Sequence, residues 1–206
     1  MGQPLNFSAK ELTYLQNTDF LLTKWEMMQR VKQLMREAEK LIRKDIHRFQ
    51  KVFPEGTLDT AGKISKGENY HRLPYVVLDY PRNFSKDHIF VFRTMFWWGH
   101  YFSTTLHLQG DYLNLYKRQL VSNLSQLQSV GYYICVHDTP WEYHFNTDNY
   151  QPLKNFSATD FQTELDKRAF TKLSRKLSLE AWVALPNFAR DTFSQLMTFL
   201  ENNTNE

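Results

Sequence analysis

The segment from Ile89 to Trp98 (IFVFRTMFWW) constrains the fold more than any other part of the chain. Its side chains are almost all apolar, which is typical of a β-strand that is covered on both faces. Arg93 lies in the middle of this segment, where a buried charge is costly unless an opposite charge neutralises it. We therefore expect a central strand at 89–98, with a carboxylate beside Arg93.

Four other segments have the pattern of strands and complete a mainly antiparallel, five-stranded sheet. The clearest is YFSTTLHL, which alternates apolar and polar side chains and follows Gly99 and His100, where a turn is favoured. Pro81 ends another of these segments, because proline cannot donate a hydrogen bond to a neighbouring strand. The other four expected strands of the sheet are residues 75–80, 101–108, 132–137 and 170–177.

Three helices are predicted to pack on this sheet. Apolar residues recur every three or four positions over 19–53, which indicates one long amphipathic helix. The same spacing predicts a helix at 112–130 and a C-terminal helix with Phe193 on its buried face. Strands in a meander followed by helical connections are typical of an α+β fold, with helices behind an antiparallel sheet.

Two long segments lack any regular pattern. Residues 54–69 are polar and rich in glycine, so we expect a loop there. Residues 139–156 form an irregular connection that is rich in aromatic side chains. Connections of that length are often functional or packed against the protein.

Length and composition favour a single domain over residues 1–206, because a chain of this size can bury one substantial core. The net charge of +3 is too small to indicate nucleic acid by itself. One cysteine excludes an internal disulfide and a cysteine-based zinc site. No apolar run could span a bilayer, and the first residues lack the pattern of a signal peptide, so we expect a cytoplasmic protein.

Arg93 supports two interpretations. The simpler one is an ion pair with Asp79, which lies in the neighbouring predicted strand. In the other, Arg93 lines a pocket and offers its guanidinium to a carboxylate or phosphate. The polar face of the next strand would then join it, with the side chains Ser103, Thr105 and His107.

Three histidines, His107, His137 and His144, are candidates for catalysis or metal binding. A general base would be His107 or His137, and the carboxylate that orients it would be Asp79 or Asp138. None of the histidines has the spacing of a known metal motif, so we expect neither a metal nor a cofactor. The remaining histidines are expected to be ordinary surface or turn residues: His47, His71, His88 and His100.

Tryptophan and tyrosine gather at the expected turn after the central strand and in the later connection. Such clusters form binding hot spots or walls that contact an aromatic ligand, and they also close the end of a sheet. Both interpretations remain open. The residues concerned are Trp97, Trp98, Tyr101, Trp141 and Tyr143.

The long N-terminal helix is basic, with nine Lys and Arg against four acids between Lys24 and Lys51. A basic face could bind RNA or a membrane surface, although a solvated helix surface is the commoner meaning of such a run. The aromatic residues lie on the apolar side of this helix and do not alternate with the charges. That arrangement argues against a stacking platform for single-stranded nucleic acid.

The chain resembles the YktB-like family of uncharacterised bacterial proteins over roughly residues 60–200. The resemblance rests on Leu73-Pro74, on HIFVF from His88, and on FTKLSRKLSL from Phe170, followed by a phenylalanine-rich last helix. It implies an α+β fold whose sheet is concave towards the helices. It transfers no catalytic residues, because the activity of that family is unassigned.

These patterns lead to three functional hypotheses. The first is a non-catalytic module that binds a small molecule or a protein through the aromatic cluster, with Arg93 and His107 as polar anchors. The alternative is an enzyme that acts on a small anionic substrate through an Arg, His and Asp pocket. A minor alternative is nucleic-acid binding by the basic helix. We expect a monomer or homodimer that does not associate with membranes.

Overall fold

The computed structural model describes residues 6–201, and its centre is a seven-stranded antiparallel sheet. The strands are β1 (Lys63–Tyr70), β2 (Leu73–Phe84), β3 (Ile89–Trp97), β4 (Tyr101–Gln109), β5 (Tyr133–Cys135), β6 (Tyr150–Pro152) and β7 (Phe170–Ser178). They lie in the order β1-β2-β3-β4-β7-β5-β6, so β3 and β4 are central. The expected α+β class and the antiparallel sheet are therefore confirmed.

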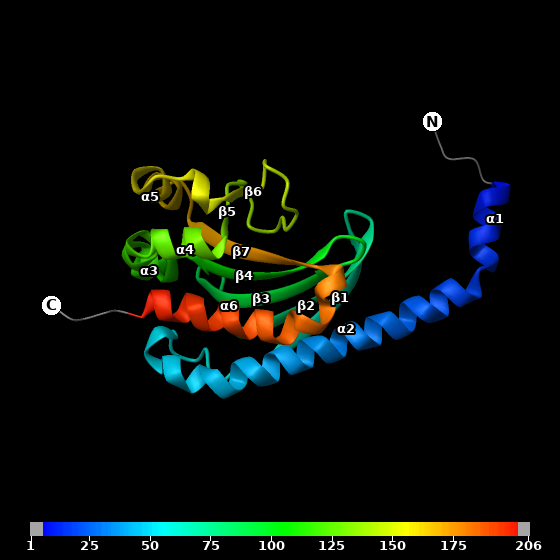
Figure 1. The fold of residues 1–206 in the computed structure, drawn as a ribbon, viewed down its shortest axis with the longest axis horizontal. Helices are drawn as coiled ribbons and strands as arrows, with labels where there is room; N and C mark the ends of the chain where they lie inside the picture. Colours follow the sequence, from blue (N-terminus) through cyan, green and yellow to red (C-terminus); the bar gives the residue numbers. More distant parts are fainter. Residues whose placement is uncertain (1–5, 202–206) are drawn as a thin grey trace.

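Helices cover one face of this sheet. The helical segments are α1 (Ala9–Gln16), α2 (Thr18–Asp45), η1 (Ile46–Val52), α3 (Asp111–Ser122), α4 (Leu124–Val130), η2 (Leu153–Asn155), α5 (Ala158–Asp166), η3 (Leu179–Ala184) and α6 (Leu185–Leu200). Figure 1 shows α2 and α6 side by side along the sheet. They bury the apolar side chains that the 3.6-residue spacing places on one side of each helix.

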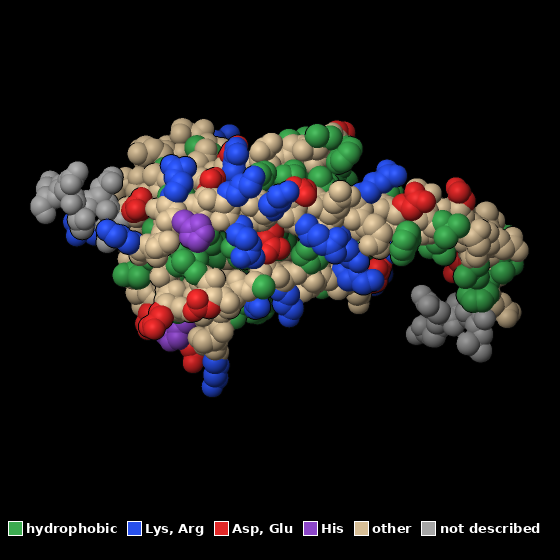
Figure 2. Space-filling model, turned by 90° about the horizontal axis from the view of Figure 1, so that it is seen from below, with side chains coloured by type: hydrophobic (Ala, Val, Ile, Leu, Met, Phe, Trp, Pro, Cys, Tyr) green, Lys and Arg blue, Asp and Glu red, His purple; other side chains and the backbone are tan. Residues whose placement is uncertain are grey.

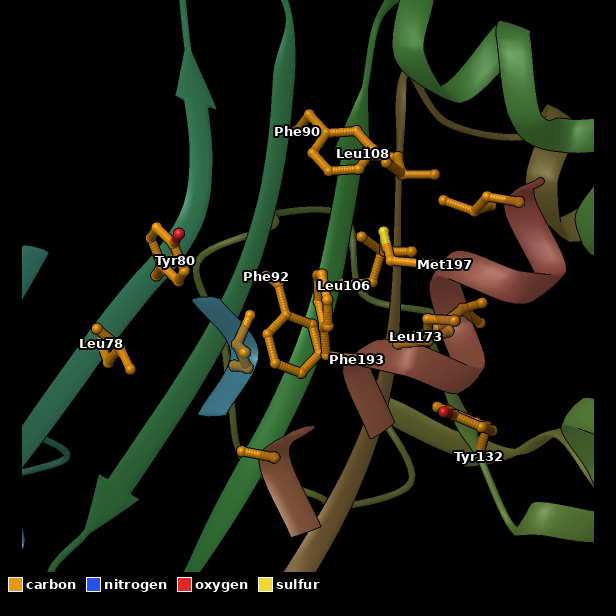
Figure 3. Packing of buried hydrophobic residues seen from close by; sticks show 14 of the residues in the cluster. Leu78, Tyr80, Phe90, Phe92, Leu106, Leu108, Tyr132, Leu173, Phe193 and Met197 are labelled. Atoms are coloured by element: carbon orange, nitrogen blue, oxygen red, sulfur yellow. The ribbon is translucent and has the colours of Figure 1, made fainter. Parts of the chain in front are cut away.

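The main core lies between the sheet and these helices. Alternate side chains of the central strands point into it, as the two-residue period of a strand requires. Phe92 of β3 packs edge-to-face on Phe193 of α6, with ring centroids 5.5 Å apart. Leu106 and Leu173 from the neighbouring strands contribute to the same cluster (Figure 3). The opposite face of β3 therefore carries Arg93, away from the helices.

The expectation of five strands is wrong, because β1 and β6 also belong to the sheet. β1 begins inside the segment 54–69, for which the sequence predicts a polar loop, and extends one residue beyond it. Its side chains are polar because it is an edge strand and most of them are exposed or half-buried, so no apolar alternation marks it. β6 has three residues, too few for a pattern, and lies within the connection 139–156.

Several boundaries also differ from the expected ones. β2 continues beyond Pro81 to Phe84, and its register with β3 shifts between Asp79 and Arg82, next to the proline that cannot donate a hydrogen bond. The helix expected at 112–130 is divided into α3 and α4 at Asn123, whose backbone leaves the helical conformation. The long helix is α-helical to Asp45 and continues as the 3-10 segment η1.

The N-terminal part of the chain extends beyond the sheet as an arm, residues 6–27, formed by α1 and the first part of α2 (Figure 1). None of the residues of α1 is buried, and the first buried residue of α2 is Met28. Within residues 6–201, no helix combines the length and the apolar character that crossing a bilayer requires.

Candidate functional site

A long loop covers the sheet face that the helices leave free. This covering loop, residues 136–149, connects β5 to β6 and is hydrogen-bonded to side chains of β1, β3, β4 and β7. The polar face of the sheet is therefore buried beneath it. Arg93, Thr105 and His107 lie on that face, as the alternation of β3 and β4 predicted.

Arg93 is held by two partners in this layer. Its Nε and Nη2 donate to the two carboxylate oxygens of Asp79 at 2.7 and 2.8 Å, and its Nη1 donates to the Tyr143 hydroxyl of the covering loop. Asp79 lies directly opposite Arg93 in the β2–β3 register, so the expected ion pair is confirmed. Burial lowers the pKa of Arg93, but the hydrogen bonds with Asp79 and Tyr143 outweigh burial and raise it.

Lys172 of β7 is a second buried cation, and the sequence analysis did not select it. Its side chain is 0% exposed and donates to the backbone carbonyl of Glu142 in the covering loop. Its ammonium also lies 4.4 Å from the ring centroid of Tyr143 and 5.1 Å from that of Tyr150, which favours a cation. Burial nevertheless lowers the pKa of Lys172 to about 8.

His107 is buried beside these cations. Burial, and then the charges of Lys172 and Arg93, lower the pKa of His107 to about 3. Its Nε2 is buried and has no hydrogen-bond partner among the described residues. A neutral imidazole with so low a pKa is a poor general base near neutral pH.

The other polar candidates have structural partners or lie outside this layer. Ser103 and Thr105 are buried, and the Thr105 hydroxyl bonds to that of Ser174 at 2.8 Å. His137, at the start of the covering loop, accepts a hydrogen bond from the backbone of Thr139. Asp138 is fully exposed and lies 3.6 Å from Arg168. Neither His137 nor Asp138 has a hydrogen bond or ion pair with Arg93 within residues 6–201.

The aromatic candidates do not form one cluster. Trp97 and Tyr101 pack with Tyr143 of the covering loop and with side chains of β2 and β3. Trp98 directly follows β3, packs against the main core on the helix side of the sheet, and lines a groove beside α2. Trp141 is 53% exposed, and its ring centroid lies 6.0 Å from that of His107.

A surface pocket of about 240 Å³ opens where the covering loop meets the ends of the strands. Trp97 and Tyr101 form part of its wall, and the His100 ring stacks on Trp97 with centroids 3.6 Å apart. Lys176 brings a cation to the pocket. Its lining residues are His71, Trp97, His100, Tyr101, His144, Phe145, Asn146 and Lys176.

Tyr70, the last residue of β1, fixes the covering loop at this pocket. Its hydroxyl accepts hydrogen bonds from the backbone N–H groups of Tyr143 and His144 at 2.6 and 3.0 Å. It donates to the Glu142 carboxylate at 3.0 Å. Tyr70 therefore positions three consecutive loop residues. Sequence reasoning missed it, because β1 was expected to be a loop.

Lys172 had a detectable signal in the sequence. It shares a face of the predicted strand with Phe170 and Ser174, and in the structure it lies opposite His107 in the β4–β7 register, so the two side chains are on the same side of the sheet. His71 and Glu142 gave no comparable signal, because each is a single polar residue in a predicted loop.

The basic side of α2 carries paired charges. Arg43 contacts Glu39 at 2.6 Å, and Arg30 lies 3.8 Å from Glu26. Lys24 pairs with Glu68 of β1 at 2.8 Å. Figure 2 looks onto the α2 side of the molecule and shows acidic side chains among the Lys and Arg. The positive charge on this face is therefore partly neutralised.

Removing one partner of the buried Asp79–Arg93 pair should strongly destabilise the folded protein. Asp79→Asn leaves Arg93 buried with no opposite charge, so we expect the free energy of unfolding to fall by about 3 kcal/mol. In the double variant Asp79→Leu/Arg93→Met neither charge remains, and we expect a smaller loss. Urea denaturation of both variants measures this difference. If the single variant were as stable as the wild type, the pair would not be buried as described.

The burial of His107 should make the stability of the folded protein depend on pH. The unfolded chain takes up a proton on this histidine as pH falls below about 6.5, whereas the folded protein resists protonation down to about pH 3. The free energy of unfolding is therefore highest above pH 6.5 and falls as the pH is lowered. We expect this histidine to account for a decrease of about 2 kcal/mol between pH 6.5 and 4.5. His107→Gln should remove this part of the loss in urea denaturation. His47→Gln, which removes an exposed histidine, is the control, and parallel curves for wild type and His107→Gln would refute the prediction.

Comparison of the chain with protein-family models, with curated proteins and with solved structures found no match. The resemblance to the YktB-like family therefore stays a prediction. Any assignment of function has to come from the geometry of the pocket and its surroundings.

Proposed function

We propose that this protein is a module that binds a small anionic ligand in the pocket lined by Trp97, Tyr101 and Lys176. The observation that carries the proposal is the Lys176 ammonium, which has no carboxylate partner among the described residues. It lies 5.6 Å from the ring centroid of Tyr133 and 5.4 Å from that of Phe145. A cation on an aromatic wall is suited to bind a carboxylate or phosphate that carries a flat group.

The walls of the pocket are preorganised, which favours binding. Tyr101 donates to the backbone carbonyl of Tyr143 at 3.3 Å and accepts from the N–H of Phe145 at 3.1 Å. Together with Tyr70, it fixes the segment of the covering loop that forms one wall. Little conformational entropy is then lost when a ligand enters. The volume of about 240 Å³ suits a ligand of one ring with one anionic group.

The same geometry disfavours an enzyme built on Arg93 and His107. All three nitrogens of Arg93 already donate to Asp79 or Tyr143, and its side chain is only 15% exposed, so it is poorly placed to bind a substrate anion. Neither Arg93 nor His107 lines the pocket. A binding role therefore needs fewer rearrangements than the catalytic alternative.

The proposal is tested by removing the charge of Lys176 and measuring the binding of small aromatic anions. Benzoate and phenyl phosphate are suitable probes, and calorimetric titration measures their affinity. We expect Lys176→Gln to weaken binding about tenfold, because a charge-assisted hydrogen bond is lost. Lys86→Gln changes an exposed lysine in the β2–β3 turn and should bind like the wild type. If neither probe binds the wild type, or if Lys176→Gln binds equally well, the proposal is wrong.

A second candidate function, self-association, is favoured by the arm. Nine large apolar side chains between Phe7 and Met27 are exposed, and Trp25 is 63% exposed. Exposed apolar surface that is gathered on one segment is typical of protein–protein interaction sites. An apolar groove of about 450 Å³ lies beside α2, lined in part by Met27, Trp98 and Trp182.

The arm cannot cover the groove of its own chain, because α2 runs as one helix from Thr18 to Asp45 and holds the arm away from the sheet. The arm of a second copy is apolar, as the groove is. We therefore propose that two chains form a dimer in which the arm of each chain lies in the groove of the other.

Sedimentation velocity tests this second candidate. We expect the wild type to be a dimer at micromolar concentration and Trp25→Glu to be a monomer, because the charge would be buried in the interface. Trp141→Glu alters another exposed tryptophan, on the covering loop, and should remain a dimer. A monomeric wild type would rule out arm exchange.

A further inference from the structure

Three side chains with metal-binding atoms converge at the edge of the pocket: His71, Glu142 and His144. The His71 Nε2 lies 3.1 Å from the Glu142 Oε2, and the His144 Nε2 lies 3.7 Å from the same oxygen. One ligand atom from each of the three residues lies within 4.8 Å of the other two. Ligands bound to one zinc ion at about 2.1 Å in a tetrahedral arrangement lie about 3.4 Å apart, so only small side-chain movements are needed.

Surrounding groups hold two of these side chains in place. The Tyr70 hydroxyl donates to Glu142 and accepts from the backbone of His144, so a single group orients both loop residues. On the far side of the His144 ring, the Nδ1 is buried, has no hydrogen-bond partner within residues 6–201 and lies 3.9 Å from the carboxylate of Asp148. A carboxylate behind a histidine ligand is a common feature of metal centres, because it fixes the ring and increases its basicity.

The backbone at His71 gives an independent indication. His71 and Arg72 form the two-residue turn between β1 and β2, and both have positive φ values, of 48° and 64°. Turns of this kind favour Asn-Gly, because other residues are strained there. This turn places the His71 imidazole opposite the covering loop. Strained residues of this kind cluster at functional sites.

We propose that His71, Glu142 and His144 bind one divalent transition-metal ion of the zinc class. Two imidazoles and one carboxylate suit Zn²⁺, Co²⁺ or Fe²⁺, whereas Mg²⁺ and Ca²⁺ prefer oxygen ligands alone. The inference goes beyond the proposed function, because the ion would bind while the pocket is empty.

An ion in this position would keep a coordination site for a further ligand. His71 and Glu142 have side chains that are 49% and 31% exposed, whereas that of His144 is 10% exposed. His71 and His144 both line the pocket, so the open side of the ion faces it. Three protein ligands with one open position are the arrangement of zinc sites that bind water or an anion.

The test uses the untagged full-length chain after removal of metals with a chelator. Titration with Zn²⁺ by calorimetry should give one ion per chain, and Co²⁺ should develop the visible absorption of a four- or five-coordinate ion. We expect His71→Asn to weaken Zn²⁺ binding at least about tenfold. Asparagine is among the residues that tolerate positive φ, so this variant keeps the turn. Glu142→Gln should weaken binding as well.

His47→Gln removes an exposed histidine of η1 and should bind Zn²⁺ like the wild type. Absence of stoichiometric binding to the wild type would overturn the proposal. Wild-type affinity in His71→Asn would overturn it too. The metal titration uses no organic anion, so a protein that does not bind Zn²⁺ can still be tested for benzoate binding. A protein that does not bind benzoate can likewise be tested for Zn²⁺ binding.

Discussion

The burial of one guanidinium organises the half of the molecule that carries the candidate site. Arg93 lies in the middle of a central strand, where leaving a charge without partners would cost several kcal/mol. Asp79 neutralises that charge from β2, but Nη1 of Arg93 needs a further acceptor, which the Tyr143 hydroxyl supplies. Tyr143 belongs to the covering loop, so neutralising and satisfying Arg93 also requires that loop to lie on the sheet.

The covering loop then determines the geometry of the pocket. Lys172, Tyr70 and Tyr101 each bond to loop backbone within three positions of Tyr143. Ordering a loop of fourteen residues costs conformational entropy, and these hydrogen bonds help to offset that cost. Backbone hydrogen bonds at these points hold Glu142 and His144 against His71, although more than sixty residues separate them in the sequence. The same interactions that satisfy the buried cation therefore preorganise a surface site.

The strands and the ion pair that could be predicted from the sequence are those marked by buried apolar or charged side chains. The polar edge strand and the turn residue of the candidate site could not be predicted in this way. The central strands were found because their side chains are apolar on one or both faces, and the pair of Asp79 with Arg93 followed from the cost of a lone charge. β1 was missed because an edge strand can be polar. The sequence alone predicts an ordinary surface or turn residue at His71, since neither its positive φ nor its distance from Glu142 is visible in one sequence.

Charge explains why the two proposed ligands would support each other. Arg93 and Lys172 both bond to the covering loop from the sheet beneath it, and Lys176 lies in the wall of the pocket, so an anion is favoured there. These cations would also repel a metal ion, and the carboxylates of Glu142 and Asp148 offset that repulsion locally. A bound divalent ion would add positive charge beside the pocket and strengthen anion binding. Because coupling between two sites is reciprocal, the anion would strengthen metal binding by the same factor.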